Sequence, residues 1–169
     1  MKKYVIVSAL EKEFPFKDEL NVIYTGIGKI NATISLMTYL YENSDIDNVI
    51  NVGSAGGVSN FKNEVVSCGT FIDGDMNYPG YEPDNIVFNS DLYSISTFDS
   101  FQTKIPSQKC DCIDMESYAF AKICKLKKIN FFCFKYISDT IGDNKQESDW
   151  IENYHKGRFT LKESVIKLL

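Results

Sequence analysis

Residues 49–57 read Val-Ile-Asn-Val-Gly-Ser-Ala-Gly-Gly, and this stretch points to the fold class. Its apolar first part, Val49–Val52, predicts a buried strand, because short runs rich in Val and Ile are typical of strands covered on both faces. The second part, Gly53–Gly57, predicts a loop directly after that strand. Ligands of α/β folds bind beyond the carboxyl ends of the strands. The loop therefore predicts either backbone amides that hold a polar ligand or a tight turn that holds none.

Apolar runs on both sides of this stretch repeat the pattern. They predict strands over residues 4–9, 22–25, 65–72, 93–98 and 131–137. Helical spacing of apolar residues predicts helices over 29–42, with Asn31 as a cap, over 115–127, and over 148–168 with an interruption near Gly157. Residues 73–90 and 99–109 are expected to be loops. Alternating strands and helices predict one α/β domain over residues 1–169, a three-layer α/β/α sandwich around a mixed, largely parallel sheet.

The composition excludes several classes of function. The 169 residues carry 23 acidic and 18 basic side chains, and a net charge of −5 does not favour a nucleic-acid partner. The chain has one arginine, Arg158, and one histidine, His155, so it can build neither a histidine-rich metal site nor an arginine cluster for phosphate. No stretch has the about 18 apolar residues of a membrane span, and no secretory signal is evident, so we expect a cytoplasmic protein. The cysteines form no CxxC pair and are expected to be reduced, mostly buried thiols: Cys68, Cys110, Cys112, Cys124 and Cys133.

Glycines or carboxylates follow most of the predicted strands. Residues 26–29, Gly-Ile-Gly-Lys, complete neither of two phosphate-binding motifs: Ile30 replaces the Ser or Thr of a P-loop, and Asn31 replaces the third glycine of a dinucleotide fingerprint. Glu13 and Asp139 are isolated carboxylates, which in most proteins are solvated surface charges. Asp139 follows a strand of buried type, and burial raises a carboxyl pKa and makes the group a candidate general acid. Glu116 lies in the first turn of a predicted helix, where interaction with the helix dipole is its simplest role.

Five sequence blocks, taken together in chain order, resemble one known family. They are VSALEKEF (7–14), TGIGKINA (25–32), VINVGSAGG (49–57), IDMESYAFAKIC (113–124) and FKYISD (134–139). They are similar to blocks of the 5′-methylthioadenosine/S-adenosylhomocysteine nucleosidase branch of the purine nucleoside phosphorylase superfamily. The resemblance misses most of residues 73–109 and indicates a shortened variant. It implies a three-layer α/β fold that hydrolyses the N-glycosidic bond of a 5′-substituted adenosine, such as 5′-methylthioadenosine or S-adenosylhomocysteine.

The resemblance also implies a role for each matching residue. Asp139 would protonate purine N7, Ser138 would orient Asp139, and Glu13 would position and activate water. Such an acid and base suit the cleavage of a glycosidic bond, which passes through an oxocarbenium-like state. The remaining contacts would be Glu116 with a ribose hydroxyl, Met115 packed on the sugar, Ser54, Ala55 and Gly56 along the ribose, and Phe101 stacked on the purine.

The same resemblance sets expectations about cofactors and partners. It implies no metal and no organic cofactor, and its partner is a small-molecule purine nucleoside, with no nucleic acid and no membrane. Members of the family are commonly homodimers in which a loop of one subunit closes the 5′ pocket of the other. The segment Tyr78–Tyr81 is consistent with such an interface and equally with a loop packed on its own chain.

Three alternatives to a hydrolase remain open. Phosphorylase relatives hold phosphate with arginines, one of them just before the glycine-serine stretch, where this chain has Asn51; hydrolysis is therefore favoured over phosphorolysis. Lys135 likewise stands where many relatives have an arginine before the Ile-Ser-Asp motif. A non-catalytic nucleoside-binding domain has no need of Glu13, which argues against that class. An unrelated α/β protein that matches by chance is the third alternative.

Overall fold

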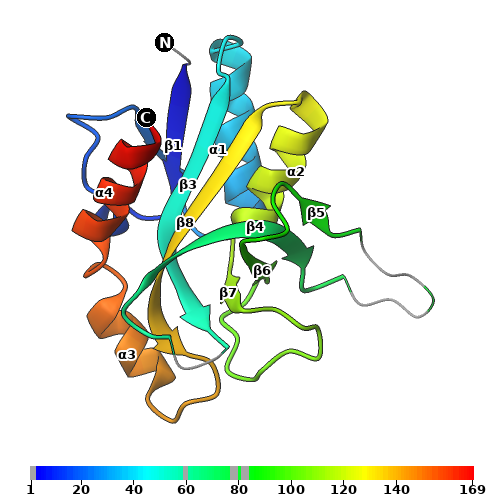
Figure 1. Cartoon of the computed structure of the whole chain (residues 1–169), viewed down its shortest axis with the longest axis vertical. Helices are drawn as coiled ribbons and strands as arrows, with labels where there is room; N and C mark the ends of the chain where they lie inside the picture. The colour runs from blue at the N-terminus through cyan, green and yellow to red at the C-terminus, as the bar shows by residue number, and fades with distance from the viewer. Residues whose placement is uncertain (1–2, 59–60, 77–79, 81–83) are drawn as a thin grey trace.

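The structure is a computed structural model that describes residues 3–58, 61–76, 80 and 84–169 (Figure 1). The strands are β1 (Tyr4–Ser8), β2 (Val22–Tyr24), β3 (Asn48–Gly57), β4 (Val65–Asp73), β5 (Ile86–Val87), β6 (Tyr93–Thr97), β7 (Cys112–Asp114) and β8 (Asn130–Thr140). The helices are α1 (Lys29–Glu42), α2 (Ser117–Lys127), α3 (Gln146–Asn153) and α4 (Arg158–Leu168), and a 3₁₀ turn, η1 (Glu11–Glu13), follows β1. All the predicted strands and helices are present, and the break expected near Gly157 separates α3 from α4.

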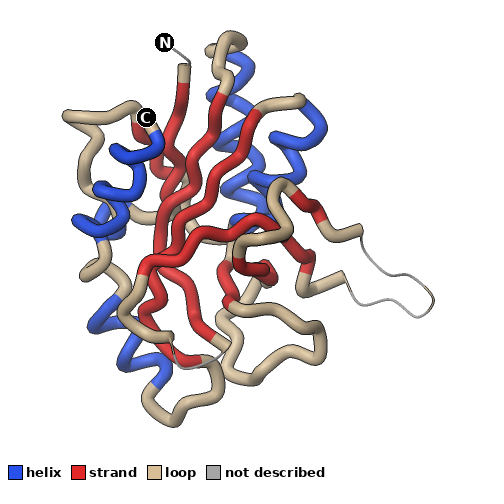
Figure 2. Tube along the Cα trace, viewed as in Figure 1, coloured by secondary structure: helices blue, strands red, loops and turns tan. Residues whose placement is uncertain are grey.

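The strands form one mixed sheet that closes on itself (Figure 2). Their order is β2-β1-β3-β7-β6-β4-β5, and β8 pairs with both β3 and β4, so β3, β8, β4, β6 and β7 form a ring from which β1 and β2 extend. The parallel pairs are β1–β2, β1–β3, β3–β8, β4–β6 and β6–β7. The antiparallel pairs are β3–β7, β4–β5 and β4–β8. The expected mixed, largely parallel sheet is confirmed.

Helices lie on both faces of the sheet (Figure 1). On one face α1 and α2 pack together, and Leu36 and Phe120 join a core cluster with side chains of β1, β3 and β8. On the other face α4 contributes Leu161 and Val165 to a second cluster around Ile50. Each such buried side chain contributes about 1.5–3 kcal/mol by its removal from water. The expected three-layer arrangement is therefore confirmed.

The glycine stretch Gly53–Gly57 is not the loop that its composition predicts. It is the second half of β3, which continues to Gly57 in pairing with β8 and, at its end, with β7. Glycine is used here because other side chains occupy the space where a Cβ would lie. A Cβ at Gly53 would come within 3.3 Å of Glu13 Oε2, and one at Gly56 would overlap Ile141 Cδ1. Side chains from outside the strand thus approach its backbone closely, which explains why glycines occur here although glycine disfavours strands.

Several element boundaries also differ from expectation. Met115 and Glu116 form the turn between β7 and α2, so Glu116 precedes the helix instead of lying in its first turn. Asn31 lies inside α1, whose N-terminal flank is Gly28. Strand β8 extends through Ser138 and Asp139, which were expected at its edge. The short strands β5 and β7 carry too few residues for a periodic signal.

Two further features bear on the sequence expectations. All five cysteines are free thiols and buried. Over the described residues, no helix combines the length and the apolar character that crossing a bilayer requires. Of the segment 78–81, everything except Gly80 lies outside the described residues.

Candidate active site

One cavity of about 490 Å³ lies where β1, β3, β7 and β8 end, beside α3. It is lined by residues far apart in the chain, as expected for the carboxyl ends of strands in an α/β fold. Of the residues that the sequence singles out, eight line this cavity: Glu13, Ser54, Ala55, Gly56, Phe101, Met115, Glu116 and Asp139. The ninth, Ser138, is fully buried behind the wall and hydrogen-bonds to Asp139.

The Glu13 carboxylate is held by three hydrogen bonds. Its Oε1 accepts bonds from the backbone N–H of Ser54 at 2.9 Å and from the Ser54 hydroxyl at 2.7 Å. Its Oε2 accepts a bond from the backbone N–H of Leu10 at 3.2 Å. Burial raises the pKa of Glu13, whereas the bonds from Ser54 act in the opposite direction because they stabilise the anion. The result is a buried hydrogen-bond acceptor of fixed orientation at the cavity wall.

A bulge in β8 sets the position of Asp139. Ala55 pairs with Ile137 and Gly56 with Asp139, so Ser138 is an extra residue in β8 at this point. Bulges redirect the side chains that follow them and are frequent beside functional sites. Here the bulge brings Asp139 against Gly56, where an added Cβ would lie 3.0 Å from Asp139 Oδ2.

The two oxygens of Asp139 have different surroundings. Oδ1 accepts a hydrogen bond from the Ser138 hydroxyl at 2.7 Å. Oδ2 is buried and has no hydrogen-bond partner among the described residues. Burial raises the pKa of Asp139, and the bond from Ser138 and the nearby Gln146 side chain oppose this only in part. A buried carboxyl oxygen without a partner is costly as an anion, so this group is poised to carry a proton and to share it with a ligand.

Glu116 also lines the cavity and is anchored by the turn before α1. Its Oε1 accepts a hydrogen bond from the backbone N–H of Gly28 at 2.9 Å. Gly28 has φ of 96°, a left-handed value that favours glycine, which explains the second glycine of the Gly-Ile-Gly-Lys stretch. Burial and repulsion from Asp114 raise the pKa of Glu116 to about 8. The neighbouring Met115 lines the cavity and is half-buried.

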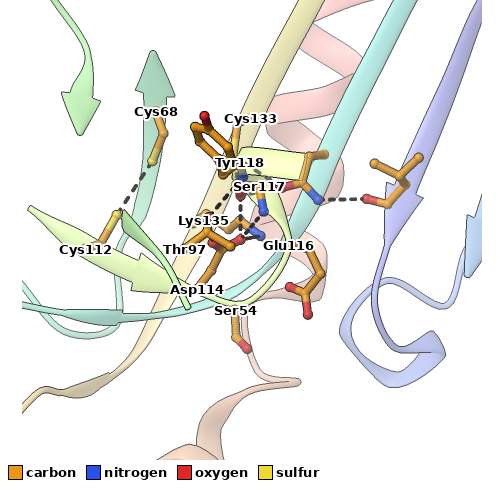
Figure 3. A network of polar contacts seen from close by, with 12 residues as sticks. Ser54, Cys68, Thr97, Cys112, Asp114, Glu116, Ser117, Tyr118, Cys133 and Lys135 are labelled. Atoms are coloured by element: carbon orange, nitrogen blue, oxygen red, sulfur yellow. Dashed lines mark hydrogen bonds and ion pairs between the residues drawn. The ribbon is translucent and has the colours of Figure 1, made fainter. Parts of the chain in front are cut away.

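Asp114, which belongs to the cavity wall, forms a buried ion pair with Lys135 behind it (Figure 3). Lys135 Nζ lies 3.0 Å from Asp114 Oδ2, and the two side chains are only 2% and 1% exposed. Asp114 also accepts bonds from the Thr97 hydroxyl at 2.7 Å and from the backbone N–H of Ser117 at 2.9 Å. Burial would raise the pKa of Asp114, but the charge of Lys135 and these bonds outweigh it and lower that pKa. The pair is therefore ionised, and its positive charge also faces Glu13 and Glu116.

The network continues away from the cavity to Asn51. The Asn51 side-chain oxygen accepts a bond from the Ser117 hydroxyl at 2.9 Å, and its nitrogen donates to the Val7 carbonyl at 3.2 Å. Asn51 is buried and is not part of the cavity wall. The position where phosphorylase relatives carry an arginine is thus a neutral structural site in this chain.

Helix α3 and the segment after β6 form the outer wall, which the sequence analysis identified only through Phe101. The Phe101 ring lies 5.9 Å from the ring of Trp150, centroid to centroid, and both line the cavity. Gln146 ties the two elements together, because its side-chain nitrogen donates to the Gln102 carbonyl at 2.8 Å. Trp150 is the only tryptophan of the chain, and nothing in its local pattern signals that α3 folds back over the sheet.

The cavity wall is acidic. Five carboxylates belong to it, those of Glu13, Asp114, Glu116, Asp139 and Glu147. Among the described residues that form the wall there is no Lys, Arg or His. Across the part of the chain that the structure describes, no group of His, Cys, Asp and Glu side chains is arranged to hold a metal ion.

Comparisons with known proteins agree with the fold and with the sequence blocks. The sequence model of the Phosphorylase superfamily matches residues 95–169. A curated relative, the 5′-methylthioadenosine/S-adenosylhomocysteine nucleosidase of Thermotoga maritima, is 27% identical over 166 residues, which cover 85% of this chain and 76% of the relative.

Solved structures extend the likeness over nearly the whole chain. A 5′-methylthioadenosine/S-adenosylhomocysteine nucleosidase from Colwellia psychrerythraea, in complex with adenine, superimposes with a TM-score of 0.84 at 20% identity, over 97% of this chain and 93% of that one. A futalosine hydrolase mutant of Helicobacter pylori gives a TM-score of 0.86 at 15% identity, over the full length of both chains. The resemblance to the nucleosidase branch of this superfamily is therefore confirmed, in a short chain.

Proposed function

We propose that this chain, with its nucleoside phosphorylase-like fold, is a purine nucleoside N-glycosidase that uses Asp139 as general acid and Glu13 to activate water. One observation carries the proposal. A single cavity brings together a buried carboxyl with an oxygen that lacks a partner and a second carboxyl held as an acceptor by three hydrogen bonds. One carboxyl that can donate a proton and one that can accept it are what acid–base cleavage of a glycosidic bond requires.

The placement of the two carboxyls along β3 supports this assignment. Glu13 contacts the strand at Gly53 and Asp139 contacts it at Gly56. Three strand residues span about 10 Å at about 3.3 Å each. The two carboxyls therefore meet β3 at separate points, and both line the same cavity.

Asp139 is proposed to donate a proton to purine N7. Its burial and its raised pKa favour the protonated acid in the empty site, and Oδ2 is the oxygen without a protein partner. Protonation of the base stabilises the departing purine as the glycosidic bond breaks. Ser138 is proposed to orient the carboxyl through Oδ1, which leaves Oδ2 directed at the base. General acid assistance of this kind contributes about 10²–10⁴-fold to a rate.

Glu13 is proposed to hold and deprotonate the attacking water. The donors from Ser54 and Leu10 stabilise its anion against the burial that raises its pKa, and they fix its orientation, so it can accept a proton from a water on the sugar face opposite the base. Lys135 stabilises the Glu13 anion from behind the wall. The anion also lies where positive charge develops on the sugar.

The remaining wall residues are assigned to sugar and base. Glu116 is proposed to accept a ribose hydroxyl, with Met115 against the sugar face and the backbone of Ser54–Gly56 along its edge. Phe101 is proposed to stack on the purine, close to Trp150. These contacts need no metal ion and no organic cofactor.

The acidic wall favours hydrolysis over phosphorolysis. A phosphate nucleophile needs arginine or lysine donors, and none belongs to the described wall. The Glu13 anion of the proposed mechanism would also repel a phosphate bound beside it. Asn51, buried away from the cavity, supplies no substitute.

The proposed substrate is a 5′-substituted adenosine, such as 5′-methylthioadenosine or S-adenosylhomocysteine. The names of the Thermotoga relative and of the Colwellia structure support this class. The apolar wall residues Ile27, Leu10 and Met115 suit the thioether part of such a substituent. A 5′-phosphate is disfavoured because the described wall offers it no Lys, Arg or His partner.

We further propose that the protein is a homodimer through the exposed face of α1. Ile27, Ile30, Ile34, Met37 and Tyr41 recur at spacings of three and four residues and are all exposed. This spacing places Ile30, Ile34, Met37 and Tyr41 on one side of α1 as an apolar stripe, and Ile27 lies just before the helix begins. Ile27 also lines the cavity, so a second copy on this stripe would reach the site. Sedimentation of the wild type and of Ile34→Lys tests this; a wild-type monomer contradicts it.

The activity is tested by base release from a panel of nucleosides in phosphate-free buffer. The panel contains 5′-methylthioadenosine, S-adenosylhomocysteine, 5′-deoxyadenosine, adenosine, inosine, guanosine and futalosine, the last because a fold neighbour is a futalosine hydrolase. Release of adenine from the 5′-substituted adenosines is the expected result. Adenine binding without release from any nucleoside would contradict the proposal and favour a non-catalytic binding domain.

A further inference from the structure

The lysine of the Gly-Ile-Gly-Lys stretch lies in a charge cluster that the proposed chemistry does not use. Lys29 Nζ lies 2.9 Å from Asp73 Oδ1, 2.8 Å from Asp75 Oδ2 and 3.6 Å from Asp99 Oδ2. Its side chain is only 16% exposed. Three carboxylates around one ammonium leave the cluster negative, so Lys29 cannot serve as a phosphate site despite its motif.

The cluster joins two segments that are distant in sequence. Asp73 is the last residue of β4, and Asp75 follows it, whereas Asp99 follows β6. The backbone N–H of Asp99 donates to Asp75 Oδ2 at 2.7 Å, so Asp75 receives bonds from both Lys29 and the second segment. Lys29 therefore ties α1, the end of β4 and the segment after β6 to one point.

The segment after β6 is the one that enters the cavity. Ser100, Phe101 and Gln102 line the cavity and come directly after Asp99. Gln102 is held at its carbonyl by Gln146 of α3. Asp99 and Gln102 are thus two anchors, and Ser100 and Phe101 lie between them.

We propose that Lys29 is a positioning residue for purine recognition, which holds the Ser100–Gln102 segment in place so that Phe101 can stack on the base. The inference rests on the proposed function for the identity of the ligand. The preceding residue, Gly28, holds Glu116 through its backbone N–H. One turn therefore positions the sugar acceptor with Gly28 and the base-stacking segment with Lys29.

Lys29 bears on binding of the base and not on the chemical step. Lys29 touches neither Asp139 nor Glu13, so its loss leaves acid and base in place. Its loss frees the Asp99 end of the segment, and the base must then order Phe101 when it binds. Partly exposed ion pairs are weak singly, but this network shares one cation among three carboxylates.

The test compares Lys29→Met with Lys29→Arg and with a matched control, Lys162→Met. Lys162 forms a partly exposed ion pair with Glu19 on the α4 face of the molecule, away from the cavity wall. We expect Lys29→Met to raise KM about 5- to 10-fold with kcat changed less than about 2-fold, and Lys29→Arg to restore KM. High salt, at about 1 M, should raise the wild-type KM toward that of Lys29→Met and leave the variant unchanged. Equal KM values in all variants would overturn the inference.

Two measurements keep the inference independent of turnover. Hydrogen exchange at the amides of Ser100–Gln102 should be faster in Lys29→Met than in Lys162→Met. The affinity for adenine, measured by quenching of Trp150 fluorescence, should be lower in Lys29→Met than in Lys162→Met. If the wild type cleaves no nucleoside, the proposed function fails. The exchange rates and the adenine affinity still test whether Lys29 positions the Ser100–Gln102 segment. If Lys29→Met does not fold, Asp75→Asn takes its place with the same expectations; unchanged exchange and adenine affinity in a folded variant overturn the inference.

Discussion

We expect the stability of the protein to depend on pH through Glu116, and one substitution should remove this dependence. The carboxyl is buried beside Asp114, and burial together with that repulsion raises its pKa from 4.5 to about 8. Between these values the folded chain keeps the Glu116 proton and the unfolded chain has lost it. Because the unfolded state then binds fewer protons, the free energy of unfolding falls as pH rises.

The size of the effect follows from the gap between the two pKa values. Each pH unit within the gap changes the free energy of unfolding by about 1.4 kcal/mol. From about pH 5.5 to about pH 8 the wild type should therefore lose about 3 kcal/mol through this residue alone. Glu116→Gln keeps a side-chain oxygen for the Gly28 N–H but carries no proton that can be lost, so this part of the decline disappears.

Urea unfolding of both proteins at about pH 5.5 and pH 8.5 measures the difference. Glu163→Gln, an exposed position on α4, is the matched control and should follow the wild type at both pH values. The stability of Glu116→Gln relative to the wild type should rise by about 3 kcal/mol between the two conditions. A relative stability that changes by less than about 1 kcal/mol would refute the reasoning that Glu116 is held protonated by its surroundings.

Other substitutions test the remaining parts of the site. Asp139→Asn should lower kcat at least about 10²-fold with unchanged unfolding, and near-normal turnover would remove Asp139 from the acid role. Glu13→Gln should lose turnover while adenine still quenches Trp150 fluorescence; wild-type rates would contradict water activation. Gly56→Ala should lower the free energy of unfolding by about 1–3 kcal/mol, because the added Cβ overlaps Ile141 Cδ1. Urea unfolding curves that superimpose on those of the wild type would contradict this expectation.

The layers of the fold were predictable because each rests on a local pattern. Apolar runs such as Val49–Val52 mark strands, and the spacing of residues 29–42 marks a helix, so alternation alone gave the fold class. Gly53–Gly57 was misread because strand propensity disfavours glycine. The reason for these glycines is the approach of Glu13 and Ile141 from elsewhere in the chain, which no local window contains.

The site was predictable as far as its residues lie in the recognised blocks. Asp139 and Glu13 were found in this way, but the bulge at Ser138 that directs Asp139 appears only in the pairing of β8 with β3. The sequence also indicated a buried ion pair at Lys135, since a lysine within an apolar strand run requires a buried partner. Trp150 had no such signal, because only the return of α3 over the sheet brings it to the cavity.

The central claim is hydrolysis by an acid and a base, and product analysis tests it most directly. The wild type and Asp139→Asn are incubated with 5′-methylthioadenosine, with and without phosphate, and the sugar product is identified. The account predicts adenine and a free 5′-substituted sugar at a rate that phosphate leaves unchanged, and formation of the same products at least about 10²-fold more slowly by Asp139→Asn. Sugar 1-phosphate formed only when phosphate is present would contradict it.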